Sequence, residues 1–322
     1  MKLTVRLALR DWDYLTPLLL GDVTDPRIDL QIDRVGTLVD DLASDPAYDG
    51  AELSFSRYLQ ARSAGDRQVL GVPCFLMRGF RHRCILTLKS SPMTRLEDLA
   101  GCRIGVTGWQ DSGNTWTRAA LADAGVGVED ARWYAGRLTA AHPITDRLGR
   151  FARPGRIEAL AGEQPMIEAL MDGGLDALFT PFMPVGFFAP DSPFRQLVTD
   201  FRSAEIGYYS RVGYVPGMHI LGLKAPVAEA HPWLAAALGD LFDRSFAMWQ
   251  EKRRKYAETT PWILQDIACA EAHLRPDWAA SGLAANAKMI ADFTAQALGQ
   301  GLIARHLTAG EIFPADAAAL AA

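Results

Sequence analysis

Two apolar runs in the first third of the chain are separated by a short cationic segment. Residues 69–77 and 84–88 are rich in Val, Leu, Ile and Phe and too short for ordinary helices, so both predict buried strands. Residues 78–83, which join them, carry three arginines and a histidine. Ligands of open α/β sheets bind outside the strand ends, so Arg78 and Arg81 predict an anionic ligand, above all a carboxylate. A solvated loop paired with surface acids is the alternative.

The rest of the chain alternates between strand and helix patterns. Strands are predicted at residues 3–9, 51–56, 102–106, 175–180 and 218–224, and helices at 35–43, 57–64, 115–124, 231–258, 261–274 and 283–298. A capping-box pattern at residues 308–311 predicts a last short helical turn. The chain of 322 residues exceeds the roughly 250–300 at which single cores divide. We therefore expect an α/β protein with a first lobe of residues 1–88 and 220–322, a second lobe of residues 89–219 inserted into it, and C-terminal helices.

Composition and charge narrow the class of protein. The formal net charge of −5 and the scattered basic residues give no footprint for nucleic acid or an anionic membrane. Four cysteines lack CxxC spacing and are expected to be free thiols: Cys74, Cys84, Cys102 and Cys269. Arg6 interrupts the N-terminal apolar run, which argues against a signal peptide, and no window approaches the roughly 18 apolar residues of a membrane span. We expect a cytoplasmic protein that acts on a small molecule, and the sequence leaves a homo-oligomer open.

Three further segments bring polar groups to element ends. Asp11 follows the first strand, and Glu52 and Ser54 stand at the end of another. Residues 108–115 precede a helix whose free N–H groups could cradle an anion, although an ordinary helix cap explains them equally well. His219 lies near the start of an apolar strand. The common alternative to a catalytic histidine at such a position is a core histidine whose hydrogen bonds are satisfied within the protein.

Strands, an inserted second lobe and a helical return match the two-lobed fold of type 2 periplasmic binding proteins. Beyond that, the chain resembles the 4,5-dihydroxyphthalate decarboxylase family from Ala51 to Phe313. The matching residues, in order, are Ala51-Glu52-Leu53-Ser54, Ser56-Arg57-Tyr58-Leu59, Arg78-Gly79-Phe80-Arg81-His82, Gln110, Trp116, Arg118, Tyr208-Tyr209, Met218-His219, His231-Pro232-Trp233, Gly282-Leu283-Ala284-Ala285-Asn286, Gln300-Gly301-Leu302 and Leu307-Thr308-Ala309-Gly310-Glu311-Ile312-Phe313. The chain departs from the family at residues 181–184, an apolar Pro-Phe-Met-Pro turn where the family has an arginine, and at residues 142–153. The turn predicts a substrate with fewer acidic groups or a larger ring.

The resemblance implies a cofactor-independent decarboxylase of a hydroxylated aromatic or heteroaromatic acid. Such chemistry needs a carboxylate clamp, a proton donor aimed at the ring carbon, and a group that draws the phenolic proton. We expect His219 or His82 as the proton donor and Glu52 as the phenolic acceptor, with Asp11 as its substitute. The remaining expected substrate-binding residues are Ser54, Arg78, Phe80, Arg81, Gln110, Ser112, Gly113, Asn114, Thr115, Trp116 and Arg118. A metal held by His82, His219 and Glu52 stays an alternative to the metal-free site.

Two other functions stay open. A solute-binding component of a transporter would share the fold and the anion clamp, but should carry an export signal. Another cytoplasmic enzyme of this fold, such as one acting on chorismate-derived acids in menaquinone biosynthesis, matches Phe80-Arg81-His82 less well. In every case we expect the two lobes to close on the ligand, because the candidate groups fall on both.

Overall fold

The computed structural model describes residues 2–314 of the chain. It divides into two compact units. Unit 1 comprises the described residues within Met1–Arg78, Gly213–Thr294 and Arg305–Ala322, and unit 2 comprises Gly79–Val212 and Ala295–Ala304. The chain thus leaves unit 1, forms unit 2 and returns, which is the connectivity of a two-lobed α/β fold with an inserted second lobe.

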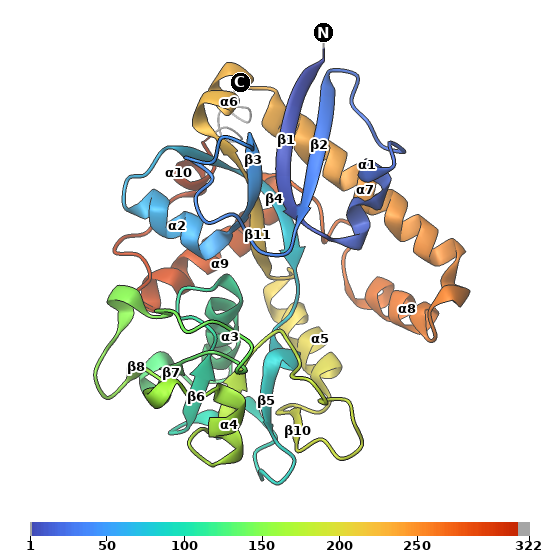
Figure 1. Ribbon diagram of the computed structural model, residues 1–322. Helices are drawn as coiled ribbons and strands as arrows, with labels where there is room; N and C mark the ends of the chain where they lie inside the picture. Colours follow the sequence, from blue (N-terminus) through green and yellow to red (C-terminus); the bar gives the residue numbers. More distant parts are fainter. Residues whose placement is uncertain (1, 315–322) are drawn as a thin grey trace. The chain divides into compact units, whose positions relative to one another are not determined.

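Unit 1 is built on a five-stranded sheet of order β2-β1-β3-β11-β4 (Figure 1). Its strands are β1 (Leu3–Arg10), β2 (Ile28–Val35), β3 (Gly50–Ser54), β4 (Val69–Arg78) and β11 (Gly217–Lys224). Its helices are α1 (Thr16–Leu19), α2 (Phe55–Ser63), α6 (Ala225–Ala230), α7 (Leu234–Lys255), α8 (Ile263–His273), α9 (Leu283–Gly299, whose last turn is counted with unit 2) and α10 (Ala309–Ile312).

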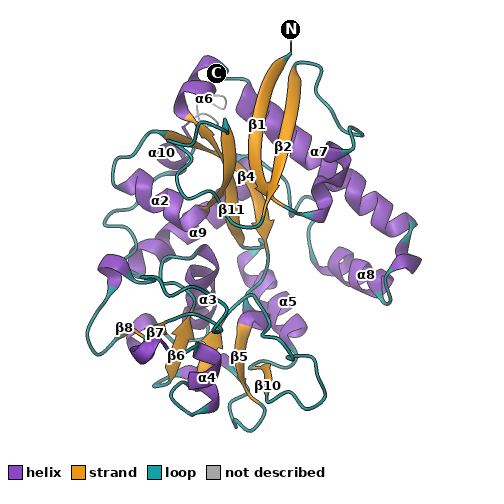
Figure 2. Ribbon diagram, in the orientation of Figure 1, coloured by secondary structure: helices purple, strands orange, loops and turns teal. Residues whose placement is uncertain are grey.

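Both faces of this sheet are covered. Apolar residues of α7, such as Leu238 and Phe242, pack with β1 and β4 side chains in one buried cluster, so α7 covers one face (Figures 1 and 2). On α2, the Phe55 ring stacks on Phe293 of α9 at 4.5 Å and on Phe313 at 5.9 Å. These buried faces account for the continuous apolar runs of the central strands.

Unit 2 has a six-stranded sheet of order β10-β5-β9-β6-β7-β8. Its strands are β5 (Ile85–Leu88), β6 (Arg103–Val106), β7 (Arg132–Ala135), β8 (Ile157–Ala159), β9 (Ala177–Phe179) and β10 (Phe194–Gln196), and its helices are α3 (Ser112–Asp123), α4 (Met166–Met171) and α5 (Phe201–Val212). Strands β6, β7, β8 and β9 are parallel, whereas β5 runs antiparallel to β9. The segment before β5 therefore lies at the same sheet edge as the ends of β6 and β9.

Strand pairing divides the chain at different residues from those expected. Residues 85–88 were expected in the first lobe, but as β5 they pair with β9 and β10 of unit 2. His219 was expected in the second lobe, but it lies in β11, which pairs with β3 and β4 of unit 1. Arg81, expected beside Glu52 in the first lobe, consequently belongs to unit 2.

Most predicted elements are present, with one clear exception. Residues 35–43 were predicted as a helix, but β2 ends at Val35 and turns follow. The Asp41 carboxylate accepts hydrogen bonds from the backbone N–H groups of Ala43 and Ser44, which stabilises a turn in place of a helix. The predicted cap at Thr308 and Glu311 is confirmed, and all four cysteines are free thiols.

Candidate functional site

Glu52 lies in the middle of β3 and is completely buried. One carboxylate oxygen, Oε2, accepts hydrogen bonds from the backbone N–H of Arg10 at 3.0 Å and from the indole Nε1 of Trp12 at 2.9 Å. The other oxygen, Oε1, lies 2.5 Å from Nδ1 of His219. A buried carboxylate is tolerated only when its oxygens are satisfied in this way. Glu52 is therefore a fixed acceptor inside unit 1.

His219 meets Glu52 because of the strand register. His219 of β11 pairs with Ser54 of β3, so the side chains of Glu52, Ser54 and His219 share one face at the carboxyl edge of the sheet. The His219 side chain is 14% exposed, and its hydrogen bond to Glu52 is through Nδ1. That bond orients the ring and leaves Nε2 directed elsewhere. The pair, here called the Glu52–His219 dyad, has the parts of a proton-transfer group.

The other expected residues of unit 1 have different environments. Asp11 pairs with Arg34 at 3.2 Å, and both side chains are more than half exposed. Ser54 is the N-cap residue of α2, where its hydroxyl accepts from the backbone N–H of Arg57 at 3.5 Å. Asp11 and Ser54 thus have surface-pairing and capping roles in unit 1.

Arg78 is held by protein groups. Its Nη2 donates to Oδ1 of Asn286 at 2.7 Å and to the carbonyl of Ala280 at 3.2 Å, and the guanidinium lies over the Phe75 ring at 4.9 Å. Burial lowers the pKa of Arg78 to about 10. Most hydrogen-bond donors of the Arg78 guanidinium are therefore engaged by groups of unit 1. It also lines a cavity of about 200 Å³ together with Trp12.

Arg81 of unit 2 lies against the first turn of α3. Its side chain is 4% exposed, and burial lowers its pKa. A Cβ atom at Gly113 would stand 2.4 Å from Nη2 of Arg81, so only glycine permits this approach. A guanidinium beside the positive end of a helix favours an anion between them, although Asp111 and Glu205 offset part of the charge.

His82 is also in unit 2, immediately after Arg81, whereas the dyad belongs to unit 1. It is 4% exposed, its ring meets Tyr208 edge-on at 5.4 Å, and within residues 2–314 its Nδ1 has no hydrogen-bond partner. Burial, together with the Arg211 cation, lowers the pKa of His82 to about 4. His82 is consequently neutral near pH 7.

The start of α3 is closely packed. Ser112, Asn114, Thr115 and Trp116 are each at most 2% exposed. Nδ2 of Asn114 donates to the carbonyl of Gly108 at 2.7 Å and to the Thr107 hydroxyl at 3.1 Å, which fixes the loop between β6 and α3. Gln110 is half-buried on that loop, and half-buried Phe80 meets the Tyr209 ring edge-on at 6.3 Å.

Arg118 is enclosed in unit 2 and stacks on the Trp109 ring at 3.9 Å. Its Nε donates to Oε1 of Gln300 at 2.6 Å and its Nη2 to the Trp109 carbonyl at 2.8 Å. Burial lowers the pKa of Arg118 to about 9. These contacts fasten the returning segment Ala295–Ala304 to α3.

Sequence reasoning did not identify two residues that shape these sites. Trp12 donates to Glu52, and an aromatic residue directly after the first strand was the available signal. Glu205 on α5 accepts from the backbone N–H of Arg83 at 3.3 Å, and burial raises its pKa to about 7. No local pattern marks Glu205, because only the packing of α5 brings it to the cationic segment.

No group of three or more His, Cys, Asp or Glu side chains suited to a metal ion occurs among residues 2–314. The expected alternative of a metal on His82, His219 and Glu52 draws on both units, His82 from unit 2 and the dyad from unit 1. Within the same residues, no helix has the length and apolar character needed to cross a membrane.

Comparison with known proteins gives two kinds of similarity. No family model matches the chain. The chain is 29% identical over 340 residues to a 4,5-dihydroxyphthalate decarboxylase of Comamonas testosteroni, covering 97% of this chain and 96% of that protein. It is 28% identical over 229 residues to a 4,5-dihydroxyphthalate decarboxylase of Pseudomonas putida, covering 66% of this chain and 84% of that protein.

The similar solved structures share a fold with this chain and include a binding protein. The periplasmic aliphatic sulphonate binding protein SsuA of Escherichia coli has a TM-score of 0.56 at 13% identity, covering 97% of this chain and 96% of that one. The CA3427 gene product of Candida albicans, described as having the generic periplasmic binding protein fold, has a TM-score of 0.52 at 11% identity, covering 97% and 94%. The chain therefore has a periplasmic-binding-protein-like α/β fold, and in sequence it is similar over nearly its whole length to a 4,5-dihydroxyphthalate decarboxylase.

Proposed function

We propose that this protein is a carboxy-lyase that releases CO₂ from a hydroxylated aromatic acid of the 4,5-dihydroxyphthalate kind. The two similar decarboxylases support the reaction class. The observation that carries the proposal is the Glu52–His219 dyad, in which a buried carboxylate holds one ring nitrogen of a partly exposed histidine. A cytoplasmic location, expected from the sequence, is part of the same proposal.

His219 supplies the proton in this mechanism. An imidazolium at Nε2 donates its proton to the ring carbon that bears the carboxylate, while electrons from the phenolic oxygen, which keeps its own proton, form a transient protonated ketone. The bond from that carbon to the carboxylate then breaks, CO₂ leaves, and its electron pair restores the aromatic ring. One proton replaces one CO₂, so the step is balanced without a redox partner.

Glu52 positions His219 in this proposal. Both oxygens of Glu52 are occupied by protein donors and its side chain is 0% exposed, which leaves little opportunity to take a phenolic proton directly. A carboxylate on Nδ1 instead fixes the ring orientation and stabilises the imidazolium that carries the proton. Asp11, exposed and paired with Arg34, takes no part.

Arg81 and the start of α3 bind a carboxylate of the substrate. The buried guanidinium beside Gly113 presents a planar pair of donor groups, and the N-terminal turn of α3 adds the positive end of the helix dipole. Asn114, through Nδ2, and Arg118, through Nε and Nη2, donate to protein acceptors and hold this region in place. Arg78 has the corresponding supporting role in unit 1.

The apolar turn at residues 181–184 indicates how the substrate differs from a dicarboxylate. Phe182 is 54% exposed, whereas Met183 packs against a buried cluster of unit 2. An exposed ring in place of a cation favours a substrate with one carboxylate fewer or a larger ring system.

The test is a screen for CO₂ release from hydroxylated benzoates, phthalates and heteroaromatic acids, run with His219→Asn in parallel. We expect at least one acid to lose CO₂ and the variant to be slower by roughly 10²–10⁴-fold while binding the same acid. Turnover by His219→Asn within a few-fold of the unmodified protein would reject the dyad as the proton donor.

A solute-binding protein is the second candidate, because the similar solved structures include a sulphonate-binding protein. The same screen separates the two functions. Several acids that bind tightly, with no CO₂ released from any of them, would favour the binding protein.

A further inference from the structure

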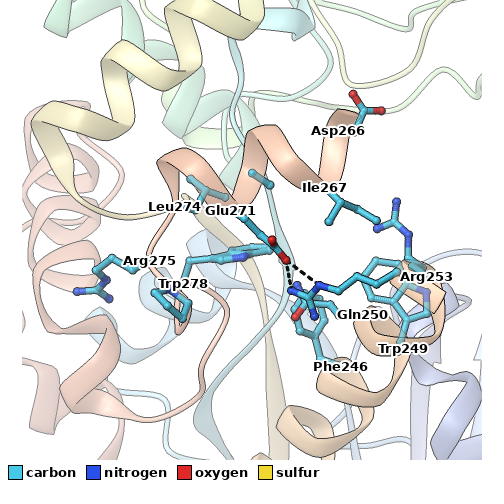
Figure 3. A pocket seen from close by; sticks show the side chains of 13 residues that line it. Phe246, Trp249, Gln250, Arg253, Asp266, Ile267, Glu271, Leu274, Arg275 and Trp278 are labelled. Atoms are coloured by element: carbon cyan, nitrogen blue, oxygen red, sulfur yellow. Dashed lines mark hydrogen bonds and ion pairs between the residues drawn. The ribbon is translucent and has the colours of Figure 1, made fainter. Parts of the chain in front are cut away.

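A second cavity of unit 1 lies between the C-terminal half of α7 and α8. Its volume is about 560 Å³, and residues 274–278 close one side (Figure 3). Small-molecule sites generally occupy roughly 300–1,000 Å³. Neither Glu52 nor His219 lines the cavity, so it is separate from the proposed proton-transfer group.

Three aromatic rings form the floor of this cavity. Phe246 lies 5.4 Å from Trp249 and meets Trp278 edge-on at 5.5 Å, and all three line the space. Ile267 and Leu274 add aliphatic surface from the α8 side (Figure 3). Ala270 of α8 also lines the space. Ring faces of this kind bind flat aromatic molecules by stacking and edge contacts.

The arginine side chains that line the cavity differ in their partners. Arg254 pairs with Glu271 at 2.6 Å, so these two groups neutralise each other. Arg253 lies over the Trp249 ring at 4.4 Å and, among residues 2–314, has no carboxylate partner. One guanidinium beside an aromatic wall is thus available for an anion.

We propose that the α7–α8 cavity is a second ligand site, specific for a planar aromatic monocarboxylate. The ring of such a ligand lies against Phe246, Trp249 and Trp278, and its carboxylate accepts from Arg253. The Arg253 guanidinium favours one carboxylate over two, because Asp266, which also lines the cavity, repels a second.

The test is calorimetric titration with benzoate, with benzamide as the neutral probe of the same shape. Arg253→Gln removes the cation, and Lys255→Gln is the matched control, because it removes one positive charge from the same end of α7 without touching the cavity. We expect benzoate to bind Arg253→Gln at this site about tenfold or more weakly, the worth of a charge-assisted hydrogen bond. Benzamide should bind both variants equally.

A second variant locates the site independently. Ala270→Trp fills the cavity from α8, and with folding checked by circular dichroism it should abolish this binding, whereas His219→Asn should retain it. Because binding is measured without turnover, the result is independent of the proposed reaction.

Three outcomes would overturn the proposal. The first is equal benzoate affinity of Arg253→Gln and Lys255→Gln, and the second is unchanged binding by folded Ala270→Trp. The third is a dimer in sedimentation that Ala270→Trp disrupts, with no benzoate bound to the unmodified protein. That result would mean that a second copy of the protein covers this face. Trp262 and Leu264, nearby in the chain, are exposed.

Discussion

The two histidines proposed from the sequence have opposite surroundings. His219 in unit 1 keeps 14% of its side chain exposed and bonds a buried carboxylate through Nδ1. His82 in unit 2 is 4% exposed, and its Nδ1 has no partner among residues 2–314. Burial favours the neutral form of His82, whereas the Glu52 carboxylate fixes the orientation of the His219 ring. The environment of each ring, and not the residue type, decides which histidine suits proton transfer.

The same contrast extends to the sheet edges that carry them. At the edge of unit 1 a carboxylate is buried with three N–H groups directed at it. At the edge of unit 2 guanidinium groups are buried, and burial lowers the pKa values of Arg81 and Arg118. A satisfied carboxylate orients a proton donor, and a desolvated cation attracts an anion. The predictions below test this division, beginning with the largest expected effect.

Glu52→Gln should produce the largest loss. The substitution keeps the size of the side chain but removes the charge that orients Nδ1 of His219, so turnover should fall by roughly 10²–10⁴-fold with little change in substrate affinity. Steady-state rates with a substrate found by the CO₂ screen measure this. A positioning role also predicts a changed pH profile of kcat, which a merely destabilised protein would not show.

Trp12→Phe is the matched variant for the same carboxylate. It removes one of the two donors to Oε2 and leaves the backbone N–H of Arg10, so its loss should be smaller, about tenfold. Equal losses in the two variants, or a loss only in thermal stability, would contradict the positioning role.

The elements of this fold were largely readable from sequence, because periodicity and end signals are local. The runs that became β4, β5 and β11 are apolar enough to identify, and the Thr308–Glu311 cap is a local pattern. The strand β2 was missed although its residues alternate between apolar and polar. The helix predicted at residues 35–43 failed because the Asp41 side chain stabilises a turn there.

The candidate site was predictable only in part, because its geometry depends on register between distant segments. Glu52 and His219 were both proposed, yet they are 167 positions apart and meet only through the β3–β11 pairing. Arg81 was expected in the first lobe but lies in unit 2, because nothing local in the sequence shows that β5 pairs with β9. Contacts of this kind follow from the completed sheet and not from the composition of either segment.

Arg81→Lys should have the next largest effect, and it should fall on binding. Lysine keeps the charge but lacks the planar fork, so the binding free energy of the substrate should weaken by roughly 1.5–3 kcal/mol. Titration with a competitive aromatic acid measures it, with Arg83→Lys, an exposed neighbour, as the control.

Gly113→Ala tests the same contact from the other side. Its Cβ would stand 2.4 Å from Nη2 of Arg81, so it should displace the guanidinium without removing any charge. Unchanged saturation behaviour in both variants would remove Arg81 from the proposed site.

His82→Asn should leave turnover within a few-fold but change the pH dependence of stability. The folded pKa of about 4 lies below the ordinary 6.5, so the contribution of His82 to stability is complete above pH 6.5 and is lost as the pH falls toward 4. The free energy of unfolding of the unmodified protein should therefore drop, relative to the variant, by on the order of 2 kcal/mol across that range. The difference between the two proteins is the quantity to measure, because Glu205, with its raised pKa of about 7, contributes the opposite slope to both. A His82→Asn protein that loses turnover as strongly as His219→Asn would reverse the assignment of the two histidines.

Asp11→Asn should have the smallest effect, which makes it the sharpest contrast with Glu52→Gln. Asp11 follows β1 and Glu52 lies within the parallel strand β3, but Asp11 is exposed and pairs with the exposed Arg34. An ion pair in water contributes little, because solvent screens the charges and two long side chains lose freedom when they meet. We expect turnover within twofold of the unmodified protein and a change in the free energy of unfolding of less than about 1 kcal/mol. Rates and denaturant unfolding, measured beside Arg34→Gln as the partner variant, test this. A tenfold loss of turnover in Asp11→Asn but not in Arg34→Gln would mean that Asp11 acts on the substrate. Burial alone would then not identify which carboxylate of unit 1 takes part in the reaction.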